Sequence, residues 1–272
     1  MNNGGTVETQ GLSILILILA FAATVIATQV IRRRRSAFPI RAMRAYESLS
    51  PIVGAAIEAN RPVHLSAGSA GVGGQNTLLA LANAELFYRV SQQAAIGTTP
   101  PLITTSDTTA IPLAYDTLRR AYESRGMMGG YRSTSVRWYP AGPRSLAYAA
   151  VLTASMGVNN VNANVLVGSF GPELALIAEA AARRDQGIIA ASDQLEGQAV
   201  AYATSDQPLI GEEIFAAGAY LGDEASFRAA LVTQDLLRWL LIIIILLSAL
   251  AAVDQNVSRF LGNLLSTIAG ER

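Results

Sequence analysis

The chain has 272 residues, of which 51% are hydrophobic and only 15% are charged, and its formal net charge is zero. Soluble proteins usually carry about a quarter charged residues, so part of this chain is expected to lie outside water. Because there is no cysteine and only one histidine, disulfides, thiolate nucleophiles, thiolate metal sites and histidine-rich metal sites are excluded.

The first feature along the chain is an uncharged apolar run at residues 12–31, which follows a short N-terminal segment at residues 1–11. A helix of about 20 residues spans the hydrocarbon core of a bilayer, so the run predicts a first transmembrane helix. A cleavable export signal, the alternative for such a run, carries its positive charge before the apolar stretch. Here the charge comes after it, at Arg32, Arg33, Arg34 and Arg35. Arginines beside a span favour the cytoplasm, so residues 1–11 are expected to be extracytoplasmic.

Residues 32–235 alternate between strand-like and helical stretches, the pattern typical of an α/β domain. Strands are predicted at 62–67, 101–105, 135–139, 162–167 and 188–191. Helices are predicted at 41–59, 76–95, 111–125, 144–156, 172–184, 195–203 and 212–220. Pro51 is expected to kink or divide the first helix. The fold expected for this cytoplasmic domain is therefore α/β, with a largely parallel, Rossmann-like sheet that carries helices on both faces.

Four loops rich in small and hydroxyl side chains follow predicted strands, at 66–74, 104–109, 168–173 and 191–193. Open parallel sheets bind ligands at the carboxyl ends of their strands, so these loops are candidate ligand-binding segments. The glycines of the first loop would let backbone N–H groups approach a phosphate or carboxylate. The candidate ligand-binding residues are Ser66, Gly68, Ser69, Gly71, Thr105, Ser106, Asp107 and Ser169.

Each candidate also has a purely structural explanation. The glycine spacing is not G-x-G-x-x-G and the chain has no lysine for a P-loop, so a standard dinucleotide site is disfavoured. Asp107 would serve equally as a helix N-cap, and Glu173 would repel an anion bound at the third loop. His64 is either a general base beside Ser66 or, more commonly for a strand histidine, a hydrogen-bonded core residue. No catalytic residue, metal ligand or cofactor is therefore assigned.

A second apolar run at residues 236–253 predicts a second transmembrane helix, which continues directly from a helix that begins near residue 224. A buried core helix is the alternative for this run. Residues 254–272 form a tail in which apolar side chains recur every three or four positions, as in an amphipathic helix. This extracytoplasmic tail is expected to bind either the lipid surface or a partner subunit.

Three stretches resemble an uncharacterised bacterial family that carries a membrane-anchored domain of unknown function. They are "RAYESLSPIVGAAIEANRPVHLSAGSAGVGG" at 44–74, "VLVGSFGPELALIAEAA" at 165–181 and "LIGEEIFAAGAYLG" at 209–222. The resemblance covers most of residues 41–253. The resemblance implies membrane segments near both ends of the chain, and it favours the view that the hydroxyl-rich loops are common to the family. It implies no activity.

Two functional hypotheses follow for a bacterial cytoplasmic-membrane protein whose main domain is cytoplasmic. The leading one is a non-catalytic structural or assembly subunit, which binds a second copy of itself or other membrane proteins. The alternative is a ligand-binding or enzymatic domain that takes a small anionic or nucleotide-like ligand through the strand-end loops. Residues 36–235 hold 13 arginines and 17 acidic residues, a net charge of −4, so nucleic acid is not an expected partner.

Overall fold

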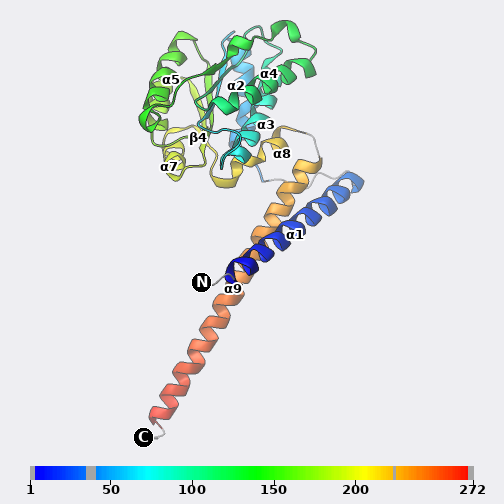
Figure 1. The fold of residues 1–272 in the computed structure, drawn as a ribbon, viewed down its shortest axis with the longest axis vertical. Coiled ribbons are helices and arrows are strands. Elements are labelled where there is room, and N and C mark those ends of the chain that lie inside the picture. Colours follow the sequence, from blue (N-terminus) through cyan, green and yellow to red (C-terminus); the bar gives the residue numbers. More distant parts are fainter. Residues whose placement is uncertain (1–3, 35–40, 223–224, 269–272) are drawn as a thin grey trace. The chain divides into compact units, whose positions relative to one another are not determined.

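A computed structural model describes residues 4–34, 41–222 and 225–268 (Figure 1). The chain divides into two units, one formed by Arg41–Glu224 and the other by Met1–Ile40 together with Ala225–Arg272. Each unit is described by itself. Arg35 and the two chain ends, at residues 1–3 and 269–272, lie outside the described residues.

The first unit is built on a six-stranded sheet in which every neighbouring pair is parallel, as the sequence predicts. The strand order is β3-β2-β1-β4-β5-β6. The strands are β1 (Val63–Gly68), β2 (Leu102–Thr105), β3 (Val136–Trp138), β4 (Ala163–Ser169), β5 (Gly187–Ser192) and β6 (Gln207–Pro208). This is the order of the doubly wound Rossmann fold, in which the direction of winding reverses between β1 and β4. Ligands bind at that reversal in folds of this kind.

Helices cover both faces of the sheet (Figure 1). The first face carries α2 (Arg44–Glu58), α3 (Thr77–Ala94), α4 (Ile111–Ser124) and α8 (Ala217–Leu221). The second face carries α5 (Leu146–Val158), α6 (Leu174–Ala182) and α7 (Leu195–Thr204). Since α3 to α7 each return the chain from the carboxyl end of one strand to the amino end of the next, the N-termini of these helices gather at one edge of the sheet and their C-termini at the other.

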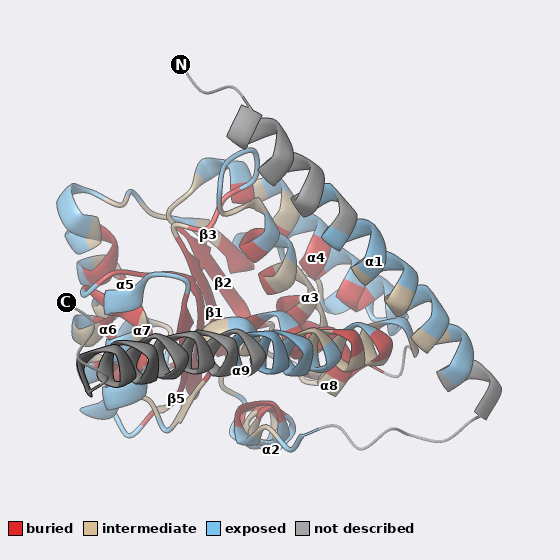
Figure 2. Ribbon diagram, turned by 90° about the horizontal axis from the view of Figure 1, so that it is seen from below, coloured by how far each residue is buried: buried red, intermediate tan, exposed pale blue. Residues whose placement is uncertain are grey.

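The four central strands, β1, β2, β4 and β5, are short and almost entirely buried, because they lie between two layers of helices. Figure 2 shows the strands in the colour of buried residues and the outward faces of the helices as exposed. An apolar cluster lies between the second face and its helices, where Tyr148, Phe170 and Leu174 are at most 1% exposed. Burial on both faces explains why these segments have apolar rather than alternating sequences.

Three sequence predictions need correction. Pro51 lies inside α2 but does not divide it, so residues 44–58 form one helix. The helix predicted at 144–156 begins two residues later, at Leu146, because Arg144 and Ser145 adopt left-handed backbone conformations with φ of 50° and 54°. The sheet also has a sixth strand, β6, which was not predicted because it is two residues long and ends in proline.

In the second unit two long helices, α1 (Gly4–Arg34) and α9 (Ala225–Ile268), contact each other. Helix α9 runs without a break from its start through the predicted second span into the tail. Within the described side chains, Ala225–Leu246 is the one stretch long and apolar enough to cross a membrane, with a mean hydropathy of 2.0. Only 11% of the 18-residue apolar window in this stretch is buried, which argues against a core helix. The apolar part of α1, Ile16–Val30, is shorter.

Candidate functional site

Seven of the eight candidate residues lie together at the carboxyl edge of the sheet, where β2, β1 and β4 end. The exception is Ser66. Alternation along β1 turns its side chain to the second face, where its hydroxyl lies 2.8 Å from the hydroxyl of Tyr148 and is fully buried. Ser66 therefore belongs to the interior of the domain, whereas the other seven residues surround the reversal between β1 and β4.

The glycine-rich loop after β1 uses most of the backbone donors that an anion would need. The Ser69 N–H donates to the carbonyl of Ser169 at 2.9 Å, and the Val72 N–H donates to the hydroxyl of Thr109 at 2.8 Å. The Ala70 and Gly73 N–H groups also donate within the domain. An anion at this loop would have to displace these bonds, so the anion cradle stays a prediction.

Asp107 caps the short 3-10 helix η1 (Thr108–Ala110), which leads into α4. Its carboxylate accepts from the Thr109 N–H at 2.7 Å and from the Thr109 hydroxyl at 2.6 Å, the arrangement expected of an N-cap. The preceding Ser106 donates both its N–H and its hydroxyl to the carbonyl of Gly68, at 2.8 and 3.1 Å. These bonds join the end of β2 to the end of β1.

Ser169 lies at the centre of the edge and is 2% exposed. Its hydroxyl accepts from the side-chain amide of Asn76 at 3.3 Å and from that of Gln194 at 3.0 Å. Asn76 precedes α3, and Gln194 precedes α7. A single hydroxyl therefore joins three loops, and neither amide was among the candidate residues because Asn and Gln have no distinctive sequence signal at these positions.

A polar pocket of about 390 Å³ lies where α5, α6 and α7 begin, and we call it the α5–α7 pocket. It is lined by Arg144, Ser145, Gly171, Pro172, Glu173, Gln194 and Glu196. Glu173 is 6% exposed, and one of its carboxylate oxygens accepts from the Gly171 N–H at 2.9 Å. The pocket therefore combines a guanidinium, two carboxylates and an amide beside the reversal between β1 and β4.

The rim of this pocket contains strained backbone. Arg144 and Ser145 are consecutive non-glycine residues in the left-handed region, and Gly142 just before them has a φ of 68°. Such conformations cost about 1 kcal/mol or more each and are found disproportionately at functional sites. Sequence reasoning missed both residues because it placed them inside a regular helix.

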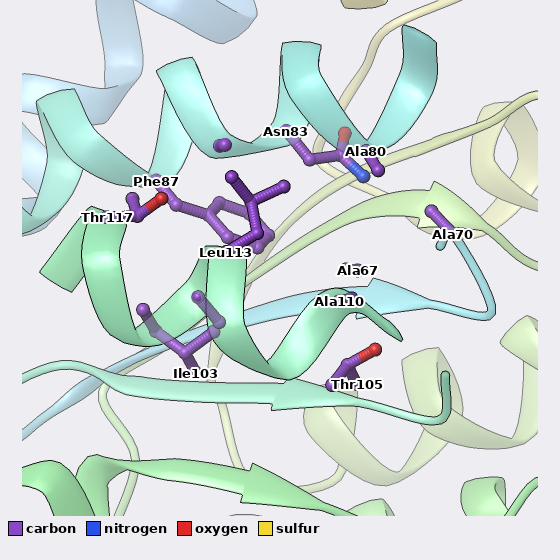
Figure 3. Close-up of a pocket in the computed structure, with 12 residues that line it drawn as sticks. Ala67, Ala70, Ala80, Asn83, Phe87, Ile103, Thr105, Ala110, Leu113 and Thr117 are labelled. Atoms are coloured by element: carbon purple, nitrogen blue, oxygen red, sulfur yellow. The ribbon is translucent and has the colours of Figure 1, made fainter. Parts of the chain in front are cut away.

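A separate apolar cavity of about 20 Å³ lies between α3, α4 and the first face of the sheet (Figure 3). Six of its twelve lining residues are alanines, and the side chain of Asn83 also borders it. Asn83 is 1% exposed, and neither atom of its amide has a hydrogen-bond partner among the described residues. Since an unpaired buried amide is destabilising, the cavity is a weak point of the core rather than an assigned site.

His64 belongs to a buried polar network on the second face. Its two ring nitrogens lie 2.9 Å from the Asn164 side-chain oxygen and 2.8 Å from the Thr104 hydroxyl. Asn164 in turn donates to Gln186, and Tyr148 donates to Thr104. His64 is 0% exposed, so it cannot touch a ligand at the carboxyl edge, and the structure supports the core role rather than the general base.

Burial sets the ionisation of this network. Desolvation lowers the pKa of His64 to about 4, the bond with Asn164 opposes that change, and the charge of Arg137 reinforces it. Burial likewise raises the pKa of the Tyr148 hydroxyl to about 12. Both groups are therefore neutral at physiological pH. Among the residues that the structure describes, no cluster of three or more His, Cys, Asp or Glu residues could hold a metal ion.

These features define a class: an α/β domain on a six-stranded parallel sheet, in a chain that also carries one long apolar helix. Sequence comparison gives the family. The chain belongs to the domain of unknown function DUF6754, which matches residues 3–261. This confirms the expected resemblance to such a domain over most of the chain, although the family description mentions neither bacteria nor a membrane. No curated protein and no solved structure matches the chain.

The buried histidine predicts a specific pH dependence of stability. Because the pKa of His64 is about 4 when folded and about 6.5 when unfolded, the unfolded chain binds the proton more readily. The free energy of unfolding should therefore fall as the pH drops from about 6.5 to about 4, by up to about 1.4 kcal/mol per pH unit from this residue.

Urea unfolding of the full chain in detergent, followed over this pH range, measures the effect. His64→Gln replaces the imidazole by an amide, which can form hydrogen bonds but does not titrate. The free energy of unfolding of this variant should therefore depend less steeply on pH. The carboxylates contribute equally to both proteins. Identical pH slopes for the two proteins would contradict the neutral, buried histidine.

Proposed function

We propose that this chain is a membrane-tethered ligand-binding protein, in which the α/β domain binds a small polar molecule in the α5–α7 pocket. The observation that carries the proposal is the left-handed pair Arg144–Ser145 at the rim of the pocket. The location agrees with the general rule that open α/β sheets bind ligands outside the carboxyl ends of their strands, where the winding reverses. A regular helix start would avoid the strain that these two residues carry.

The charge of Arg144 also supports a role in binding. The N-terminal end of a helix carries partial positive charge, so an arginine immediately before α5 is electrostatically unfavourable there. The acidic side chains at this edge have the charge that helix N-termini favour, since Asp107 and Glu173 accept hydrogen bonds from backbone N–H groups at helix starts. Arg144 is exposed, and it has no carboxylate partner in the described part of the chain. A ligand with an anionic group would offset the repulsion between Arg144 and the helix N-terminus, and it would supply the partner that the guanidinium lacks.

The pocket also indicates the chemistry of the ligand. Arg144 and the amide of Gln194 offer donors, whereas Glu173 and Glu196 offer carboxylate acceptors. The complementary molecule has an anionic group for Arg144. Because Glu173 and Glu196 would repel an anion, the parts of the molecule that face them are hydroxyl or amino groups, as nucleotides and amino acids provide. No side chain in this pocket has the arrangement of a nucleophile and a base, so the proposal is binding without an assigned reaction.

The membrane tether rests on the two apolar helices. Exposed apolar side chains such as Phe21 at 72% and Leu17 at 68% occupy α1, and Trp239 at 64% occupies α9. Such surfaces are unfavourable in water and favourable in lipid. We propose that residues 12–31 and 236–253 both span a bacterial cytoplasmic membrane, and that the arginines after the first span hold the main domain on the cytoplasmic side.

A second candidate function is assembly with another copy or another membrane subunit. A groove of about 620 Å³ runs between α5 and α6, and Leu146, Ala150, Ala154 and Leu176 line its apolar part. On α7, Leu195 is 82% exposed and Tyr202 is 74% exposed. Surfaces of this kind are typical of protein interfaces. Crosslinking in native membranes tests the candidate, and a strictly monomeric species without a partner would count against it.

The ligand-binding proposal predicts that a substitution at Arg144 stabilises the free protein but abolishes the stabilisation by ligand. In a thermal-shift screen of the full chain in detergent, a nucleotide or amino acid at 100 times its dissociation constant should add about 2.7 kcal/mol of stability. Arg144→Gly should raise the stability of the free protein by up to about 1 kcal/mol, because glycine tolerates a left-handed backbone. The same variant should lose the ligand-induced shift.

Asp185→Gly is the matched control for this experiment. Asp185 has a φ of 51°, is exposed and lies between α6 and β5, away from the pocket. Its replacement should also be neutral or stabilising but should leave the ligand-induced shift intact. If no compound of either class stabilises the protein, or if both variants respond alike, the proposed binding site is wrong.

The proposed topology predicts how introduced cysteines react in intact cells, and the cysteine-free chain gives no background. Met127→Cys lies in an exposed turn after α4. A membrane-impermeant maleimide should leave this position unlabelled in sealed cells and label it after permeabilisation, and the chain should stay in the pellet after an alkaline carbonate wash. Labelling in sealed cells would place the domain on the other side of the membrane.

A further inference from the structure

A second polar pocket, of about 230 Å³, lies at the opposite edge of the sheet, and we call it the amino-edge pocket. Pro62 and Leu102, which border it, stand immediately before β1 and at the start of β2. Its polar lining consists of Thr99, Arg132, Thr134, Ser135, Arg137 and Asn159. No residue is shared between this pocket and the α5–α7 pocket.

The lining of this pocket is positively charged, although the domain as a whole carries a net negative charge. Two arginines face it, and among the described residues no aspartate or glutamate lines it. Residues 36–235 as a whole carry a net charge of −4. Neither Arg132 nor Arg137 forms an ion pair with a carboxylate in the part of the chain that the structure describes. Two uncompensated guanidinium groups at one concave site are unfavourable unless an anion neutralises them.

Other arginines at this edge have a structural role that these two lack. Helices end here, and their last carbonyls carry partial negative charge. Arg61 donates to the carbonyls of Asn160 and Val161, at 2.9 and 2.6 Å, just after α5. Arg125 and Arg184 donate in the same way to carbonyls in the last turns of α3 and α6. Arg125 and Arg184 therefore cap helix C-termini, and Arg61 binds the chain just beyond one.

Neither Arg132 nor Arg137 donates to a carbonyl at the end of an α-helix among the described residues. The one hydrogen bond of Arg137 runs from its Nε to the carbonyl of Thr134 at 3.4 Å, which leaves its two terminal NH2 groups for a ligand. Arg137 is half-buried on β3, in register with Thr104, so the strand holds its position. The hydroxyl of Ser135, a buried residue, and that of Thr134 add neutral donors.

We infer that the amino-edge pocket binds a phosphate group, either as inorganic phosphate or as the phosphate of a small monoester. Two guanidinium groups match a dianion in charge, and each can donate two parallel hydrogen bonds to its oxygens. Hydroxyl donors from Thr134 and Ser135 complete the set that a tetrahedral oxyanion requires. The site is independent of the ligand proposed for the α5–α7 pocket, because it lies at the other edge of the sheet.

Isothermal titration of the full chain in detergent, with inorganic phosphate and with phenyl phosphate at low ionic strength, tests the inference. Both probes should bind saturably. Arg132→Ala and Arg137→Ala should each weaken binding by about tenfold or more, since each removes charge-assisted hydrogen bonds. Arg120→Ala is the matched control, because it removes one exposed arginine from α4 outside the pocket and should change affinity by less than about twofold.

Further arms of the experiment separate the possible outcomes. Arg132→Glu alters an exposed side chain without disturbing the core, and it should abolish binding. Thermal melting in the absence of phosphate should not fall, because the glutamate removes the repulsion between the two guanidinium groups. Arg144→Gly, in the other pocket, should leave phosphate affinity unchanged. Tight binding of phenyl phosphate together with weak binding of inorganic phosphate identifies a monoester as the ligand. Absence of saturable binding, or equal effects of Arg120→Ala and Arg137→Ala, overturns the inference.

Discussion

The backbones of β1 and β4 lie so close at their carboxyl ends that neither Gly68 nor Gly168 has room for a side chain. A Cβ at Gly68 would overlap the carbonyl of Ser169, and one at Gly168 would overlap the backbone of Ala67. This contact lets the Ser69 N–H reach the carbonyl of Ser169, and it leaves the carbonyl of Gly68 free to accept from Ser106. The loops after β1, β2 and β4 are therefore joined at one point, and the starts of α5, α6 and α7 are positioned around it.

Several charged side chains of the domain match the electrostatics of its helix ends. Asp107 and Glu173 accept backbone N–H groups where helices begin, whereas Arg61 and Arg184 donate to carbonyls where helices end. The arginines of the two proposed pockets do not fit this scheme, since Arg144 precedes a helix start, and Arg132 and Arg137 donate to no α-helix carbonyl within the described residues. The preference of helix ends for opposite charge therefore explains the positions of the first four residues. It also identifies the three arginines of the pockets as charges whose partner is expected to be a ligand.

The sequence predicted the type and approximate position of the main helices and strands, because apolar periodicity depends only on local chain order. It did not predict the strand order, which depends on contacts between distant segments. Ser66 was assigned to the carboxyl edge by its place in the chain, but the alternation of the strand turns it to the other face. Arg144 and Ser145 were missed because a left-handed backbone at these residue types leaves no trace in composition.

The central claim is that the loop after β1 meets the end of β4, and a disulfide in this cysteine-free chain tests it most directly. Asn76→Cys combined with Ser169→Cys replaces two side chains whose polar atoms lie 3.3 Å apart. Mild oxidation should block both thiols within one chain, as read by mass after alkylation. Asn76→Cys combined with Val158→Cys, at the far end of α5, should keep both thiols free. Free thiols in the first pair, or a disulfide in the second, would contradict the strand order and the two pockets derived from it.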